Sequence, residues 1–171
     1  MSQLPNLRLR GVNLGGWLVL ERWMQPSLFA DTEARDEYEF MQTPGALDKL
    51  RHYQKTFIQE EDFRWMADHG INAVRIPVGY WVLDGDPPFR SCIGRLDWAV
   101  RMADKYGLRV LISLHGAPGS QNGRDHSGRQ GKAEWYQHPE YQAQTITILQ
   151  RLAERYRDQP AVWGLELLNE P

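Results

Sequence analysis

The chain has 171 residues, of which 42% are hydrophobic and 25% are charged, and its formal net charge is -2. These values are typical of one ordinary globular domain with a sizeable core, and the small charge argues against a nucleic acid as partner. No apolar run approaches the ~18 residues needed to cross a bilayer, so we expect no membrane association.

The N-terminus and the cysteine content leave the cellular compartment open. Residues 1–10 contain no apolar stretch of the kind found in secretion signals, although the mature form of a secreted protein would look the same. Cys92 is the only cysteine and cannot form an internal disulfide. We therefore expect a soluble chain of undetermined localisation.

Strand-like and helical patterns alternate along the chain. Four strands are expected, near residues 9–14, 71–78, 109–115 and 162–170. Helical patterns separate them, at 31–53 (interrupted by Pro44 and Gly45), 56–69, 96–106 and 142–157. Thr56 and Gln59 form a capping-box pattern that predicts the start of the second helical segment, and Gly70 follows its end.

This alternation of strands and helices predicts a parallel sheet. An open doubly wound sheet and a (β/α)8 barrel both use the pattern, but no GxGxxG or P-loop motif follows the first strand. Polar residues stand where the strands end: Asn13, Arg75, His115, Asn169 and Glu170. The carboxyl ends of the strands carry the chemistry in barrels, so we favour a barrel, and four strands make half of one. We therefore expect residues 1–171 to form a single α/β domain, the N-terminal half of a (β/α)8 TIM barrel.

Glu170 is the strongest candidate for a catalytic group. It follows the fourth strand between Asn169 and Pro171, which would hold its carboxyl group rigidly at the mouth of a barrel. A general acid needs such positioning, and the alternative is an exposed glutamate without a role. If Glu170 acts as the acid in glycoside hydrolysis, the reaction needs a second carboxylate within about 10 Å of it. Glu166 lies about 13 Å from Glu170 along the strand, which is too far. We expect Glu166 to point into the barrel and to need a polar partner there.

Arg75 and His115 end the second and third strands. Arg75 is suited to orient a catalytic carboxylate through a bidentate pair, and His115 is suited to bind a sugar hydroxyl. The alternatives are a structural salt bridge for Arg75 and a hydrogen-bonded rim histidine for His115. The histidines are not spaced as metal ligands, and we expect neither a metal site nor a cofactor.

Four segments of the sequence resemble one enzyme family. They are RGVNLGGWLVLERWMQPSLF, GINAVRIPVGYW, LHGAPGSQNGRDHSGR and GLELLNEP, in the order in which glycoside hydrolase family 5 has them. Within that family, the sequence is most similar to the exo-β-1,3-glucanases, also called glucan 1,3-β-glucosidases. The likeness runs from Leu9 to Pro171. The NEP motif is shared across the family, while the GVNLGGW and LHGAPGSQNG motifs are more specific.

The resemblance implies retaining hydrolysis of a β-glucan or β-glucoside substrate. Glu170 of the NEP motif corresponds to the acid/base, and Asn169 corresponds to the residue that contacts the sugar 2-hydroxyl. Arg75 of the RIP motif would support the nucleophile.

The same resemblance implies a pocket for the terminal glucose. His115 would bind the sugar at the cleaved bond, Glu21 would bind the terminal hydroxyls, and Asn122 and Asp125 lie in the loop that shapes the pocket. This arrangement makes such enzymes exo-acting. Arg124 stands where the family has an aromatic residue at the sugar entrance, so we expect altered binding beyond the cleaved bond.

The nucleophile that the resemblance implies, a glutamate after the seventh strand, has no counterpart in these 171 residues. We therefore expect the chain to supply the acid/base and half of the glucose pocket. A complementary C-terminal half-barrel would supply the rest, as in a split or truncated hydrolase, or a second copy of the chain would cover the open sheet edges. A self-dimer would place His115 where the nucleophile belongs and would show little or no hydrolysis. The alternative to an enzyme is a catalytically inert half-barrel, a scaffold that at most binds β-glucan.

Overall fold

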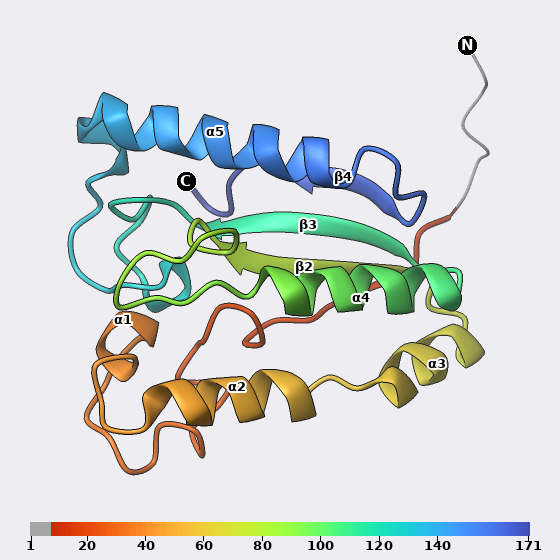
Figure 1. Ribbon diagram of the computed structural model, residues 1–171, viewed down its shortest axis with the longest axis horizontal. Coiled ribbons are helices and arrows are strands. Elements are labelled where there is room, and N and C mark those ends of the chain that lie inside the picture. The colour runs from red at the N-terminus through yellow and green to blue at the C-terminus, as the bar shows by residue number, and fades with distance from the viewer. Residues whose placement is uncertain (1–7) are drawn as a thin grey trace.

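The computed structural model describes residues 8–171 and has a four-stranded parallel sheet at its centre (Figure 1). The strands are hydrogen-bonded in chain order: β1 (Gly11–Asn13), β2 (Ala73–Gly79), β3 (Arg109–Gly116) and β4 (Val162–Glu166). Every pairing is parallel, which confirms the predicted α/β class. The carboxyl ends of all four strands therefore lie at one edge of the sheet.

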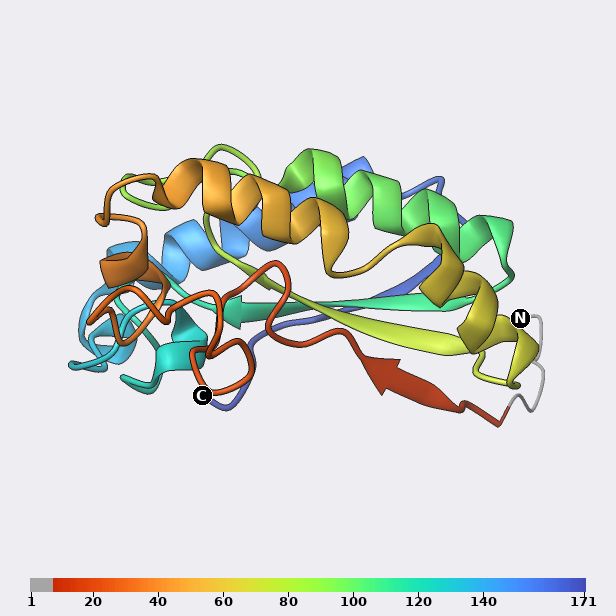
Figure 2. The same ribbon diagram turned by 90° about the horizontal axis from the view of Figure 1, so that it is seen from below.

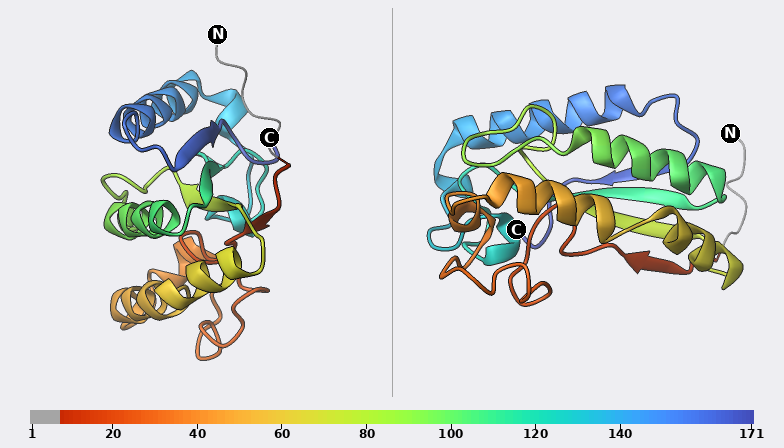
Figure 3. Two further views of the ribbon diagram at one scale, coloured as in Figure 1. Left: turned by 90° about the vertical axis from the view of Figure 1, so that its right-hand side faces the viewer. Right: turned by 60° about the horizontal axis from the view of Figure 1, so that its bottom comes forward.

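The longer helices lie on one side of the sheet (Figures 2 and 3). The helices are α1 (Glu37–Phe40), α2 (Ala46–Thr56), α3 (Glu60–Asp68), α4 (Ile93–Lys105) and α5 (Pro139–Arg155). Two short 3-10 helices, η1 (Asp125–Ser127) and η2 (Trp135–Gln137), lie in the long connection after β3. We call the face of the sheet that α3, α4 and α5 cover the outer face, and the opposite one the inner face.

Alternate side chains of β2 and β3 hold the helices on the outer face. These side chains are at most 1% exposed: Val74, Ile76, Val78, Val110, Ile112 and Leu114. The main core joins them to apolar residues of three helices, among them Phe63 of α3, Leu96 of α4 and Leu152 of α5. Because side chains alternate along a strand, Arg75 and Ser113 fall on the inner face.

The long connection between β1 and α2 has a core of its own. Leu20, Phe29 and Phe40 are buried there together with Leu50 of α2, and the Phe29 and Phe40 ring centres lie 4.9 Å apart. Leu20 directly precedes Glu21, so this packing fixes the backbone that carries the Glu21 carboxyl group.

The start of α3 differs from the sequence prediction. Thr56 is the last residue of α2, and α3 begins at Glu60. The capping box belongs to Gln59 and Asp62, because the Gln59 N–H donates to the Asp62 carboxylate at 2.7 Å. Gly70, with a φ of 78°, follows the end of this helix as predicted.

β4 is shorter than the sequence predicts, because it ends at Glu166 rather than at residue 170. Leu167 is 70% exposed, and beyond it the Asn169 N–H keeps one bond to the sheet, to the carbonyl oxygen of Leu114 at 2.9 Å. Asn169 and Glu170 therefore lie on a loop at the carboxyl edge.

Some expectations concern the chain as a whole. The segment in which the sequence predicts no secretion signal, residues 1–10, lies mostly outside the described residues. Within residues 8–171, none of the helices combines the length and the apolar character that crossing a bilayer requires. Cys92 is buried in the main core.

Candidate active site

The polar side chains of the inner face converge on Arg75. Its guanidinium group donates to the Glu166 carboxylate through Nε and Nη2, in both cases at 2.6 Å. It also donates to Asn13 Oδ1 at 3.0 Å, to Ser113 Oγ at 2.9 Å and to Asn169 Oδ1 at 2.8 Å. Arg75 of β2 is therefore bonded to β1, to β3, to β4 and to the loop after β4.

This network gives Glu166 the polar partner that the sequence predicts. The hydrogen bonds from Arg75 lower the pKa of Glu166, against the smaller opposing effect of burial. Arg75 has five N–H donors, and one hydrogen of Nη1 has no acceptor within residues 8–171. Glu166 is thus held as an anion, while Arg75 keeps one donor for a further acceptor.

Asn169 is buried and fixed on several sides. Its carbonyl oxygen accepts from Gln121 Nε2 at 2.8 Å, and its Oδ1 accepts from Arg75 at 2.8 Å. The amide group is thereby oriented with Nδ2 on the other side, 3.4 Å from Nδ1 of His126. An NH2 group in this position can donate to a hydroxyl group of a ligand.

Glu170 presents its carboxyl group to solvent, with its side chain 66% exposed. Its φ of 43° is in the left-handed region that residues other than glycine rarely adopt. Asn122 supports this conformation, because its amide donates to the Glu170 carbonyl oxygen at 2.9 Å. Oε2 of Glu170 lies 3.3 Å from Nε2 of His126, a close contact without the alignment of a hydrogen bond.

Glu21 adds a second, nearly buried carboxyl group. It is 7% exposed, and the Trp23 indole N–H donates to its Oε2 at 3.0 Å. Burial raises the pKa of Glu21, and the Trp23 hydrogen bond and the charge of His126 partly oppose that effect. The Trp23 ring is 71% exposed, which leaves an aromatic surface beside the carboxyl group.

His115 is held as a neutral imidazole. Burial, with smaller contributions from the charges of Arg75 and His126, lowers the pKa of His115 to about 4. Its ring centre lies 5.3 Å from that of His126, and its buried Nδ1 has no hydrogen-bond partner in the described part of the chain. A neutral imidazole offers one donor and one acceptor, the combination that a hydroxyl group can use.

The loop after β3 closes one side of this cluster. Gln121 is 1% exposed, and its amide donates to the carbonyl oxygens of His115 and Asn169, both at 2.8 Å. Asn122 donates to the loop after β4, and Asp125 begins η1. The loop is therefore bonded both to β3 and to the loop after β4.

Six of the seven site residues that the sequence predicts lie at this edge: Glu21, His115, Asn122, Asp125, Asn169 and Glu170. Arg75 does not end the second strand as predicted, because it is the third residue of β2 (Ala73–Gly79). It joins the cluster through its guanidinium group, which reaches Asn169. Three further contributors, Trp23, Gln121 and His126, were not predicted. His126 stands next to Asp125, and Trp23 stands two residues after Glu21, so position in the sequence offered a signal for both. Gln121 offered none, because its role depends on how two loops meet.

The arrangement defines a class of site. The carboxyl ends of the parallel strands are surrounded by carboxyl groups, an oriented amide, a neutral imidazole and an exposed aromatic ring. In (β/α)8 enzymes, substrates bind at this end of the strands. Within residues 8–171 there is no group of three or more His, Cys, Asp or Glu side chains that could hold a metal ion. Such groups can exchange protons with a polyhydroxylated ligand and hydrogen-bond its hydroxyls.

Comparison with known proteins identifies the family. A family model described as Cellulase (glycosyl hydrolase family 5) matches residues 34–171. The chain therefore belongs to glycosyl hydrolase family 5, the family that its motifs resemble.

Two curated relatives are both named as glucan 1,3-beta-glucosidases. Probable glucan 1,3-beta-glucosidase A of Emericella nidulans is 49% identical over 173 residues, which cover 96% of this chain and 42% of that protein. Glucan 1,3-beta-glucosidase of Blumeria graminis is 45% identical over 177 residues, covering 97% of this chain and 41% of that protein. This chain thus spans about two fifths of the length of the curated relatives it matches.

The crystal structure of rutinosidase from Aspergillus niger has the same fold. It matches with a TM-score of 0.88 at 24% identity, over 97% of this chain and 49% of that chain. At this identity the similarity shows the fold alone. It confirms the predicted fold class, the N-terminal half of a (β/α)8 barrel.

Proposed function

We propose that this chain carries the acid/base glutamate and half of the glucose pocket of a retaining β-glucosidase that removes terminal units from β-1,3-glucan. Membership of glycosyl hydrolase family 5 supports glycoside hydrolysis. The names of the curated relatives, glucan 1,3-beta-glucosidases, support the linkage.

The observation that carries the proposal is the different state of two glutamates near the end of β4. Glu166 is bound by two N–H groups of Arg75, which keep it anionic. Glu170 has no arginine or lysine partner within residues 8–171. Its side chain is 66% exposed and lies at the carboxyl edge of the sheet. Of the two carboxyl groups, Glu170 is the one free to exchange a proton with a ligand.

Glu170 acts twice in the proposed reaction. In the first step, a nucleophilic carboxylate attacks the anomeric carbon while Glu170 donates its proton to the departing glycosidic oxygen. In the second step, Glu170 removes a proton from the water molecule that attacks the same carbon and releases glucose. Asn122, whose amide donates to the Glu170 carbonyl oxygen at 2.9 Å, would hold the backbone of Glu170 in place in both steps.

The nucleophile would come from a complementary C-terminal half-barrel. The unused Nη1 hydrogen of Arg75 supports this, because it can orient a carboxylate that approaches the inner face. The inner face also has a shallow apolar hollow of about 320 Å³, lined in part by Val12, Leu111 and Trp163. Trp163 is 49% exposed, so a second half-barrel would bury apolar surface as it completes the site.

Four side chains would hold the terminal glucose. The Glu21 carboxyl group and the neutral His115 ring offer acceptors and donors to its hydroxyls, and the Asn169 NH2 group would donate to the hydroxyl next to the reacting carbon. The exposed Trp23 ring would pack against a C–H face of the sugar. The loop that contains Asp125 would close this pocket, which fits attack at a chain end.

The test joins this chain to the part of the Emericella nidulans relative that follows its matched region, which supplies a C-terminal half. We expect the fusion to hydrolyse laminari-oligosaccharides and an aryl β-glucoside, and Glu170→Gln to lower kcat by ~10²–10⁴-fold. Glu140→Gln is the matched control, because the Glu140 side chain is equally exposed, at 66%, and lies on α5. Unchanged activity in Glu170→Gln would contradict the assignment of the acid/base.

The 171-residue chain is assayed alone beside the fusion. Binding without hydrolysis by the chain, together with an active fusion, would support a nucleophile from the C-terminal half. Hydrolysis by the chain alone that disappears in Glu170→Gln would instead place the second carboxylate on a second copy. Binding without turnover by both proteins would favour the alternative, a catalytically inert half-barrel that binds β-glucan.

A further inference from the structure

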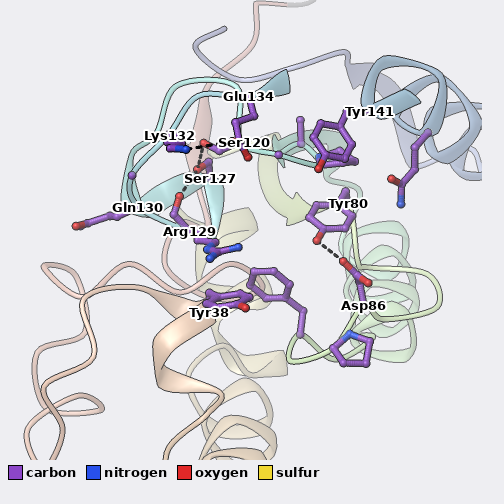
Figure 4. A pocket seen from close by; sticks show the side chains of 17 residues that line it. Tyr38, Tyr80, Asp86, Ser120, Ser127, Arg129, Gln130, Lys132, Glu134 and Tyr141 are labelled. Carbon is purple, nitrogen blue, oxygen red and sulfur yellow. Dashed lines mark hydrogen bonds and ion pairs between the residues drawn. The ribbon is translucent and has the colours of Figure 1, made fainter. Parts of the chain in front are cut away.

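A cavity of about 600 Å³ lies beside the candidate active site (Figure 4). Two parts of the loop after β3 line it, residues 117–120 and, further along, Ser127, residues 129–132 and Glu134. The segment between them contacts Glu170. Its other walls come from α1, from the connection between β2 and α4, and from α5. None of the residues assigned above to acid–base chemistry or to the terminal glucose lines it. We call this cavity the loop pocket.

We propose that the loop pocket is a second, non-catalytic binding site for a neutral β-linked gluco-oligosaccharide. The choice of a glucose polymer rests on the proposed function. The site itself is inferred from the aromatic and polar groups that line it. Its volume is within the range of about 300–1,000 Å³ that is usual for ligand pockets.

Aromatic rings in fixed positions form much of the pocket wall. Figure 4 shows Tyr80 and Tyr141 together on one side and Tyr38 on another. The Phe89 ring stacks on Trp81 with ring centres 3.9 Å apart. Tyr38 and Tyr80 pack edge-on against Phe89, with ring centres 5.7 Å and 5.9 Å away. Phe89 is only 4% exposed, so it supports the wall and fixes its neighbours. The partly exposed rings of Tyr80 and Tyr141 offer flat apolar surfaces for the C–H faces of sugars with little loss of side-chain freedom on binding.

Tyr141 is placed by the absence of a side chain at Gly119. A Cβ at Gly119 would lie 2.3 Å from the Tyr141 ring, and the φ of Gly119 is 71°. The backbone of the loop and the ring of α5 therefore pack directly against each other. The pocket wall at this point does not depend on a ligand for its shape.

Polar groups that lack partners face the aromatic wall. The guanidinium group of Arg129 lies 4.0 Å above the Tyr38 ring, and its N–H groups have no hydrogen-bond acceptor among the described residues. Gln144 of α5 also lines the pocket with its side-chain amide unpaired in the same part of the chain. These groups can donate to and accept from several hydroxyls.

The charges that line the pocket favour a neutral ligand. Arg129 and Lys132 are balanced by Asp86 and Glu134, and Lys132 lies 4.0 Å from Glu134. A phosphate site would need an excess of cations, and a lipid site would need an apolar lining. Aromatic faces beside paired donors and acceptors fit a polyol, because each hydroxyl both donates and accepts.

The experiment titrates the 171-residue chain with laminaritriose and follows the NMR signals of both sites. The Glu21→Gln variant weakens the glucose pocket, so the two sites are separated. We expect signals of Tyr80 and Tyr141 to shift with saturation in this variant. No shift at these residues would overturn the proposal, as would saturation by inorganic phosphate but not by the sugar.

Two further variants test the pocket in the Glu21→Gln background. Arg129→Met removes the donors and should weaken binding at least about tenfold, since a hydrogen bond from a charged group is worth ~1.5–3 kcal/mol. Gln144→Trp should narrow the mouth and have a similar effect, whereas Thr147→Trp on the same helix, away from the pocket, should not. Unchanged affinity in both Arg129→Met and Gln144→Trp, with folded variants, would refute the site. If the sugar bound saturably at the loop pocket while the fusion protein was inactive, the proposed hydrolysis would be refuted and the loop-pocket proposal would stand.

Discussion

The two faces of the sheet are held by different interactions. On the outer face, Val74 and Ile76 are at most 1% exposed and pack into the main core. On the inner face, Arg75, which stands between them in β2, is bonded to polar groups such as Asn13 and Glu166. Because side chains alternate along a strand, three consecutive residues of one strand serve both faces.

This difference separates stability from positioning. Apolar burial has no preferred direction, so the outer face contributes free energy of folding and tolerates small changes of angle. A bidentate ion pair that is partly exposed contributes less free energy, but it fixes the orientation of the groups that it binds. The outer face therefore mainly stabilises the fold, while the Arg75 network mainly orients Glu166 and Asn169.

Truncation of the outer layer should cause the largest loss of stability. Ile148→Ala on α5 should lower the free energy of unfolding by about 2–4 kcal/mol, because a side chain that is 5% exposed is replaced by a cavity. Ile146 on the same helix is 56% exposed, and Ile146→Ala should change it by less than about 0.5 kcal/mol. Urea denaturation measures both, and equal losses would contradict the packing of α5 on the sheet.

Glu37 is an exception to the rule that the buried layers are apolar. It is 1% exposed, accepts from the Leu20 N–H at 2.8 Å, and burial raises its pKa to about 8. An acid with a raised pKa contributes stability that is complete below about pH 4.5 and is lost as the pH rises to 8. Glu37→Gln keeps an acceptor without the charge, so it should equal the wild type in stability near pH 4.5 and become progressively more stable than the wild type as the pH rises to 8.5.

The control for this prediction lies on the same helix. Hydrogen bonds from Arg35 lower the pKa of Glu39 to about 2, so its contribution is lost only as the pH falls below about 4.5. Urea midpoints of Glu39→Gln and of the wild type should therefore differ by a constant amount between pH 4.5 and 8.5. The same constant behaviour in Glu37→Gln would show that Glu37 is not a buried neutral acid.

Loss of the Arg75 network should cost less stability than loss of the outer layer. Arg75→Met should lower the free energy of unfolding by about 1–2 kcal/mol, because the Arg75 and Glu166 side chains are 25% and 27% exposed. Arg75→Lys should not restore it, since an ammonium group cannot bind both carboxylate oxygens as a planar fork. A double-mutant cycle with Glu166→Gln measures the coupling, and full rescue by lysine would show that only the charge matters.

The same difference between the faces explains what the sequence could predict. The β-branched runs of β2 and β3 are local patterns, so the strands followed from them, whereas Arg75 was predicted at the end of its strand and was not assigned to a face. The bond from Arg75 to Glu166 joins residues 91 positions apart and depends on the register of three strands, in which Ser113 is opposite Glu166. That register predicts a polar partner for Glu166 but leaves its identity open.

Loops have no such periodicity, and most of the unpredicted contributors lie in them. The loop that carries His126 has an irregular backbone, in which Gly123 and Gly128 have φ values of 71° and 92°. A Cβ at Gly128 would lie 2.3 Å from the Trp81 ring, so the path depends on a contact with a distant element. The place of His126 beside Glu170 follows from that contact and not from any pattern in the loop itself.

The smallest effect that we predict is a shift in the titration midpoint of His115 when Arg75 is replaced. The lowered pKa keeps His115 neutral in the folded protein, whereas in the unfolded chain it takes up a proton below about pH 6.5. The free energy of unfolding therefore decreases as the pH falls from about 6.5 towards 4. NMR titration of the imidazole should therefore show neutral His115 down to about pH 4, and Arg75→Met should raise the midpoint because one repelling cation is removed. His115→Gln should lose less stability than the wild type over this range. A midpoint near 6.5 would mean that His115 is open to water and does not belong to the dry, oriented part of the inner face.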